Sequence, residues 1–181
     1  RVLAETGDAR RSDLLVDAAC FARQLELAQA SGCQILADYV RALIDGANLK
    51  SLVRTLRLKK DAAFLRELLL PGGTVSPERI VQHGFSSSAA ELFAGSALAQ
   101  AAQAAEAAAA GGSLTELERL CDNAALNVIG RARRVPFGVE VPVGYVAARE
   151  NELMSVRLVI TGLLAGIPAD QIRERLRETN G

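Results

Sequence analysis

The sequence predicts an all-α protein built from packed amphipathic helices. Half of the residues are hydrophobic (50%), but aromatic residues make up only 4% and tryptophan is absent, so leucine and alanine must form the core. Apolar residues recur at steps of three and four, and no segment shows the sustained alternation of a strand. A chain of 181 residues suffices for one large or two small domains.

Two long helices are expected first. One spans 12–30, where Ser12 or Asp13 can cap the start and Ser31–Gly32 can end it. The next spans 33–55 and carries Gly46 in its middle, which marks a kink or a close contact.

Shorter helices should follow. One spans 61–70, and another begins at Ser76–Pro77, a capping residue followed by proline at the first helical position. Ser86–Ser88 can cap a helix that starts near Ala89. The alanine-rich segment 97–110 is predicted to be helix rather than disorder, because alanine is the strongest helix former.

The last part is predicted to hold three more helices. A long helix spans 113–134, because Ser113 followed by Glu116 forms a capping box. The prolines and glycines of 135–144 predict a loop, after which helix resumes over 145–164. Pro168 starts a final amphipathic helix that is expected to run over 169–178.

A weak internal repeat indicates two similar units. Segment 12–19 resembles 117–124, and the same offset places Asp45 on Glu150. At a shorter offset, 75–80 resembles 167–172. We therefore predict two multi-helix domains, residues 1–111 and 112–181, with chance similarity between alanine- and leucine-rich helices as the alternative.

Charge and hydropathy exclude several classes of protein. The 21 basic and 21 acidic residues cancel, which disfavours a nucleic-acid binder or an electrostatic membrane anchor. No signal peptide is visible, and the longest uncharged apolar run, 158–169, is shorter than a membrane span. The first residue is arginine, so we expect a fragment or a processed chain of a soluble protein.

No catalytic or metal-binding pattern is present. The cysteines, Cys20, Cys33 and Cys121, are odd in number, lack paired spacing and lie among apolar residues, so we expect buried thiols. His83 is the single histidine and no nucleophile elbow accompanies it, which disfavours a hydrolytic triad or a zinc site. No phosphate-binding loop follows the glycines near residue 72. We predict a protein that is not an enzyme and has no cofactor, metal or small-molecule ligand.

Polar residues within the apolar helices are the candidate functional residues. Buried charges cost several kcal/mol unless paired, so structural ion pairs are the simplest explanation and contacts with another protein of an assembly the main alternative. Paired carboxylates could also serve acid–base chemistry. The candidate structural or intersubunit-contact residues are Asp45, Asn48, Lys50, Arg54, Glu150, Glu152 and Arg157. Arg131, Arg133 and Arg134 form a separate basic cluster at a helix end, which the helix dipole favours.

An ordered series of segments resembles one family, the C subunits of V/A-type ATPases, which are related to the d subunits of eukaryotic V-ATPases. The series runs through 117–123, 135–140, 144–152, 156–158 and 172–178, and 44–54 resembles the family's middle domain. The resemblance implies a funnel-shaped fold of three similar helical domains, of which this chain would hold the last two.

The resemblance also implies a role. Members of this family are non-catalytic rotor parts of the central stalk. They receive the shaft formed by the D and F subunits and sit on the membrane proteolipid ring, so that torque couples ATP chemistry to proton or other ion transport. The chain would then be cytoplasmic and peripheral to the membrane. The alternatives are an all-helical protein–protein adaptor unrelated to ATPases and, third, an all-helical enzyme with a pocket of perturbed carboxylates.

Overall fold

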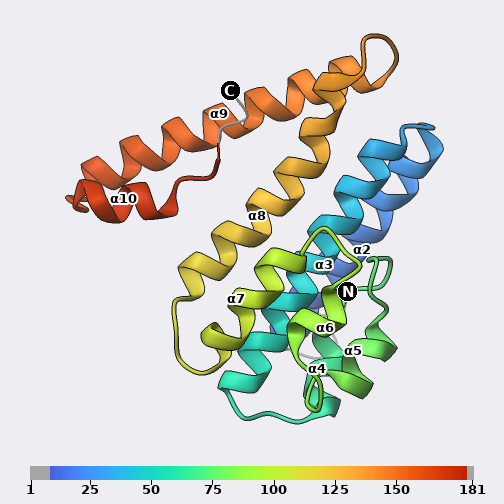
Figure 1. Cartoon of the computed structure of the whole chain (residues 1–181), viewed down its shortest axis with the longest axis vertical. Coiled ribbons are helices and arrows are strands. Elements are labelled where there is room, and N and C mark those ends of the chain that lie inside the picture. The colour runs from blue at the N-terminus through green and yellow to red at the C-terminus, as the bar shows by residue number, and fades with distance from the viewer. Residues whose placement is uncertain (1–8, 179–181) are drawn as a thin grey trace.

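The computed structural model describes residues 9–178, and over this range the chain forms helices and no strand (Figure 1), which confirms the all-α prediction. The elements in chain order are α2 (Ala9–Ala30), α3 (Gln34–Arg57), α4 (Ala62–Leu68), α5 (Pro77–His83), α6 (Ala89–Phe93), α7 (Ala99–Ala109), α8 (Leu114–Gly130), the 3₁₀ helix η1 (Arg131–Arg134), α9 (Glu140–Leu164) and α10 (Ala169–Arg175).

Side-chain caps start four of these helices. In each, an oxygen of the residue before the helix accepts a hydrogen bond from a backbone N–H three residues further on, which satisfies one of the free donors of the first turn. The capping residues are Asp61, Ser76, Ser88 and Ser113. The cap expected at Ser12 or Asp13 is wrong, because α2 is already helical at Ala9.

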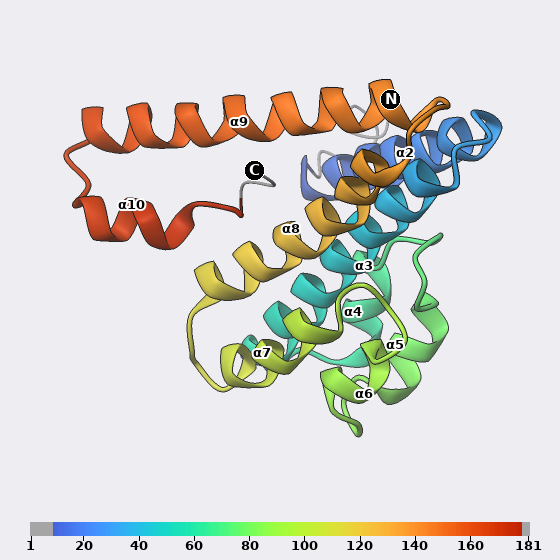
Figure 2. The same ribbon diagram turned by 45° about the horizontal axis from the view of Figure 1, so that its top comes forward.

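Helix α3 is the centre of the molecule. It packs against α2 on one side and against α7 and α8 on the other (Figures 1 and 2). Leu49, Leu52 and Val53 of α3 join the main core, which extends through α4–α8, while Val40 and Ile44 join a smaller core under α2. Since α8 shares the main core with α3, the two predicted domains are in contact, and the boundary at 111/112 stays a prediction.

The cysteines follow this packing. Cys33 and Cys121 are buried, and burial raises the pKa of the Cys121 thiol to about 12, so the residue is an inert part of the core. The expectation that Cys20 is buried is wrong. Helix α2 packs against α3 and leaves its other side, which carries Cys20, to solvent.

Two boundaries in the last part differ from the predictions. The loop predicted over 135–144 is shorter, because α9 begins at Glu140. Pro142 lies in its first turn, where the missing N–H would have no helical partner in any case. The last helix ends at Arg175 and not at 178, and Leu176–Glu178 forms an extended segment, the C-terminal strap.

The helices α9 and α10 form an arm that projects from the body (Figures 1 and 2). Although α9 has 25 residues, its buried residues are Gly144, Asn151 and Gly162. A Cβ on Gly144 would lie 2.7 Å from Cβ of Ala132 in η1, and one on Gly162 would lie 2.8 Å from Cδ1 of Ile172 in α10. Glycine thus permits the close approach of α9 to η1 near its start and to α10 near its end.

Chain order fits two related units. A long helix pair followed by a short helix occurs twice, as α2–α3–α4 and as α8–α9–α10. In this order the counterpart of α10 is α4, one helix earlier than the segment 75–80 that the sequence comparison paired with 167–172.

Candidate functional site

The seven candidate residues lie on two helices. Asp45, Asn48, Lys50 and Arg54 belong to α3, and the other three, Glu150, Glu152 and Arg157, belong to α9. The structure gives them three different environments: the core under α3, the surface between α3 and α8, and the two sides of the arm.

Asn48 is an internal clamp. Its side chain is fully buried, its Nδ2 donates to the carbonyl of Leu70 at 2.9 Å, and its Oδ1 accepts from the N–H of Leu70 at 2.8 Å. One amide therefore satisfies both backbone groups of a buried residue that lies two positions beyond α4. Asn48 holds the chain after α4 against the central helix.

Asp45 secures the same segment a few residues further on. It is fully buried, and its Oδ1 accepts from the N–H of Val75 at 3.2 Å, whereas its Oδ2 has no hydrogen-bond partner in the described part of the chain. Burial raises the pKa of Asp45, and hydrogen bonds from Val75 and Thr74 oppose that rise. A Cβ on Gly73 would lie 2.3 Å from Oδ1, so only glycine allows the loop to approach the carboxyl this closely.

The other two candidates on α3 pair with α8. Lys50 Nζ lies 4.0 Å from Asp122 Oδ1, and Arg54 Nη2 lies 3.1 Å from Glu118 Oε1. Both side chains of the Arg54 pair are well exposed, so this pair contributes no more than about 1 kcal/mol.

The candidates on α9 separate onto two sides of the helix. Glu150 and Arg157 face the body, whereas Glu152 pairs with Arg149 one turn before it. The guanidinium of Arg149 also lies 5.6 Å from the ring centroid of Tyr145. Hydrogen bonds to Tyr145 and Glu152 raise the pKa of Arg149, so it stays charged.

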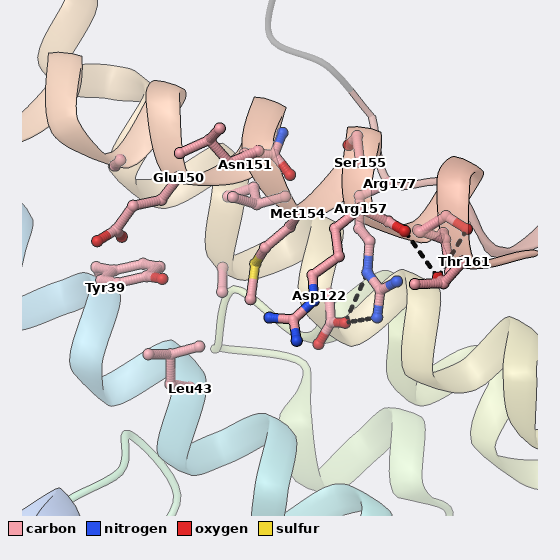
Figure 3. A pocket seen from close by; sticks show the side chains of 15 residues that line it. Tyr39, Leu43, Asp122, Glu150, Asn151, Met154, Ser155, Arg157, Thr161 and Arg177 are labelled. Atoms are coloured by element: carbon pink, nitrogen blue, oxygen red, sulfur yellow. Dashed lines mark hydrogen bonds and ion pairs between the residues drawn. The ribbon is translucent and has the colours of Figure 1, made fainter.

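Glu150 and Arg157 line a groove between the arm and the body. The groove is a hollow of about 790 Å³ whose walls are α3, α8, α9 and the C-terminal strap (Figure 3). Its apolar surface comes from residues of all three helices, and Glu150 lies beside Tyr39, a residue of α3. Burial raises the pKa of the Tyr39 hydroxyl, and the charges of Glu150 and Asp122 raise it further. The lining apolar residues of greatest size are Leu43, Leu126, Leu153, Met154 and Leu158.

The strap closes one wall of this groove. Arg177 donates to Oδ2 of Asp122 through Nε at 3.0 Å and through Nη2 at 2.6 Å. Asn123 Oδ1 accepts a hydrogen bond from the N–H of Glu178 at 2.9 Å. Asn151 Nδ2 donates to the carbonyl of the same residue, Glu178, at 3.2 Å. The strap thus ties α8 to α9, as Asn48 ties the segment after α4 to α3.

The sequence did not lead us to the residues that hold the C-terminal strap in place. Asn123 and Asn151 are polar residues within apolar helices, the same signal that selected Asn48, so they could have been found. The contact between Arg177 and Asp122 joins residues far apart in the chain and left no local signal. Arg177 and Asp122 could therefore be identified as a pair only from the folded structure.

In the described range, no three His, Cys, Asp or Glu side chains are grouped so that they could hold a metal ion. His83, at the end of α5, is exposed and lies outside the groove. Within residues 9–178, no helix has the length and apolar composition needed to cross a membrane.

Helix α9 also exposes large apolar residues that do not line the groove. Leu164 is 83% exposed, and large apolar residues recur along the whole helix. Exposed apolar side chains that gather on one element are typical of a surface that packs against other polypeptide segments. The exposed large apolar residues of α9 outside the groove lining are Val141, Tyr145, Val146, Val156, Ile160, Leu163 and Leu164.

Comparison with known proteins decides the family. The family model described as ATP synthase (C/AC39) subunit matches residues 1–175. The chain belongs to this family. It is 27% identical over 145 residues to the C subunit of the A-type ATP synthase of Thermococcus onnurineus, and 26% identical over 145 residues to that of Desulfurococcus sp..

Each of these matches covers 77% of this chain and 38% of the relative, so the matched region spans less than half the length of these proteins. No solved structure matches the chain. Membership of the ATP synthase (C/AC39) family confirms the resemblance seen in the sequence, and it argues against an adaptor unrelated to ATPases.

Proposed function

We propose that this chain is part of a non-catalytic coupling subunit of a V/A-type ATPase. In this role it links the shaft formed by the D and F subunits to the membrane proteolipid ring, so that rotation couples ATP chemistry to ion transport. The protein would work on the cytoplasmic side, peripheral to the membrane, within the assembled complex. The family and its relatives, which are named as subunits of A-type ATP synthases, support this proposal.

The uncovered arm carries the proposal. Helix α9 is long and largely apolar, yet its only buried residues in the described chain are two glycines and Asn151. Exposing such a helix to water is unfavourable by about 25 cal/mol for each Å² of apolar surface, so the arm is suited to packing against other polypeptide segments. A rotor part held between a shaft and a ring needs contact surfaces of this kind and no reactive groups.

The test is reconstitution of the full-length protein. Its binding to purified D–F shaft and to detergent-solubilised proteolipid ring is measured by analytical ultracentrifugation, and ATP-driven ion uptake is measured in vesicles. We expect the protein to bind both partners, and we expect a complex lacking it to hydrolyse ATP without ion uptake. Absence of binding to the D–F shaft would overturn the proposal.

Unchanged ion uptake without the protein would also overturn it. As a control for folding, each preparation is compared with the intact protein by circular dichroism. This separates loss of a coupling role from loss of the helical structure.

A further inference from the structure

The turn between η1 and α9 carries an exposed aromatic side chain. Phe137 is 86% exposed, more than any other large hydrophobic residue of the described range. Pro136 precedes it and Gly138 follows it, and Gly138 adopts a φ of +120°, a conformation that favours glycine. Val139 and Val141 are also exposed, at 45% and 43%. We call Phe137, Val139 and Val141 the apolar tip.

Basic residues flank the apolar tip. Three of the four residues of η1, Arg131, Arg133 and Arg134, are exposed arginines. Residues 131–149 contain four arginines and one acidic residue, Glu140, so this stretch carries a net charge of +3. The neutral charge of the whole chain conceals this local excess, which favours an anionic partner.

The apolar tip belongs to a turn at one end of the molecule. The longest axis is vertical in Figure 1, and the turn between η1 and α9 lies at its upper end, beyond the other described elements. A flat surface that approaches this end therefore meets the turn before it meets the body. A protruding turn fits a flat and deformable partner, whereas a protein partner would need a matching hollow.

The interfacial region of a lipid bilayer is a partner of this kind. Apolar side chains enter the boundary between headgroups and acyl chains, while basic side chains are attracted to anionic headgroups. Tyrosine is enriched at the same depth. Tyr145, in the second turn of α9, is 62% exposed, and the guanidinium of Arg149 lies 5.6 Å from its ring centroid. The hairpin thus carries each kind of side chain that an interfacial contact uses.

We propose that the apolar tip inserts into the surface of a membrane that contains anionic phospholipids, with the arginines of η1 on the headgroups. The tip lies on the membrane and does not cross it. One aromatic side chain with a small charge excess gives weak, reversible binding. Within the complex, protein contacts hold the tip near the membrane and so raise its effective concentration there. The inference adds a lipid contact to the proposed function and rests on it for the presence of a membrane.

Insertion is tested with tryptophan as a fluorescent reporter. Phe137→Trp places the reporter in the apolar tip. The matched variant Leu58→Trp places it at a residue that is 62% exposed in the turn between α3 and α4, at the opposite end of the molecule (Figure 1). Each full-length variant is mixed with vesicles of equal parts phosphatidylcholine and phosphatidylglycerol, and the emission of the unmodified protein is subtracted.

We expect the emission from position 137 to shift to shorter wavelength on the vesicles and to be quenched by brominated acyl chains. The emission from position 58 should not change, because that turn stays in water. An unchanged spectrum at 137, or equal shifts at both positions, would overturn the proposal.

The electrostatic part is tested by co-sedimentation with the same vesicles. The double variant Arg131→Gln with Arg134→Gln should bind about tenfold more weakly or less, because each basic residue near an anionic surface strengthens binding several-fold. The double variant Arg66→Gln with Arg79→Gln removes two exposed arginines from α4 and α5 and should bind as the unmodified protein does. Vesicles of phosphatidylcholine alone should bind the unmodified protein about tenfold more weakly. Circular dichroism confirms that each variant remains helical.

The outcomes separate this inference from the proposed function. If the unmodified protein does not sediment with anionic vesicles, or if both double variants bind equally well, the lipid contact is wrong and the coupling role is unaffected. A photoreactive residue at position 137 that crosslinks to protein and not to lipid in the assembled complex would also overturn the lipid contact. Insertion into vesicles without binding to the D–F shaft would overturn the proposed function and leave the lipid contact in place.

Discussion

Replacing Asn48 tests whether one buried amide holds the fold around α3. In Asn48→Ala, the N–H and the carbonyl of Leu70 lose their bonds of 2.8 and 2.9 Å while Leu70 remains buried. Each buried group left unsatisfied costs about 1–3 kcal/mol, so the free energy of unfolding should fall by about 3 kcal/mol or more. This is a large share of the stability of an ordinary domain, which is about 5–15 kcal/mol.

The assay is urea unfolding followed by circular dichroism, with the slope m checked for constancy between variants. Asn127→Ala, which removes an exposed asparagine from α8, is the matched control and should change the free energy by no more than about 0.5 kcal/mol. Asn48→Asp keeps an acceptor for the N–H of Leu70 but, once ionised, cannot donate to its carbonyl, so its loss should be larger at neutral than at acid pH. A loss below about 1 kcal/mol in Asn48→Ala would refute the clamp.

Three further predictions concern other contacts. Burial raises the pKa of Asp45 above 3.8, so the folded state holds this proton more tightly than the unfolded state, and stability falls as pH rises from 3.8 through the raised value. The variant Asp45→Asn has no carboxyl to ionise and so lacks this loss of stability. The urea midpoint of the variant minus that of the unmodified chain should therefore increase between about pH 4 and pH 7, and a difference that stays constant with pH would contradict the raised pKa of Asp45. Asn151→Ala frees the strap from α9, so trypsin should cleave after Arg177 several-fold faster, and an unchanged rate argues against the tie. Arg54→Ala removes an exposed ion pair and should cost less than about 1 kcal/mol in thermal or urea unfolding; a greater loss would mean that the pair is not solvent-screened.

The fold class was predictable because it depends on local signals. Helix propensity, three- and four-residue periodicity and the capping residues Ser76, Ser88 and Ser113 act over a few residues, and the structure uses them as expected. One error occurs where a distant contact overrides a local one. The helix predicted to reach 178 stops at Arg175, because Asn123 and Asn151 take the backbone groups of Glu178.

The candidate residues were predictable as a class but not in their roles. Polar residues within apolar helices pointed to Asp45, Asn48, Glu150 and Arg157, and each has a distinct place in the structure. The sequence could not say that the first two are sealed in the core while the other two line a groove. That distinction depends on which face of each helix its neighbours cover.

The sequence by itself determined that the chain is helical, where most helices begin, and which family the chain resembles, because these depend on composition, spacing and order along the chain. Only the tertiary structure decided that α9 leaves the body as an arm, that the strap returns to α8, and that a groove lies between them. These features come from contacts such as Arg177 with Asp122, between residues that are distant in sequence and acquire meaning only when the helices pack.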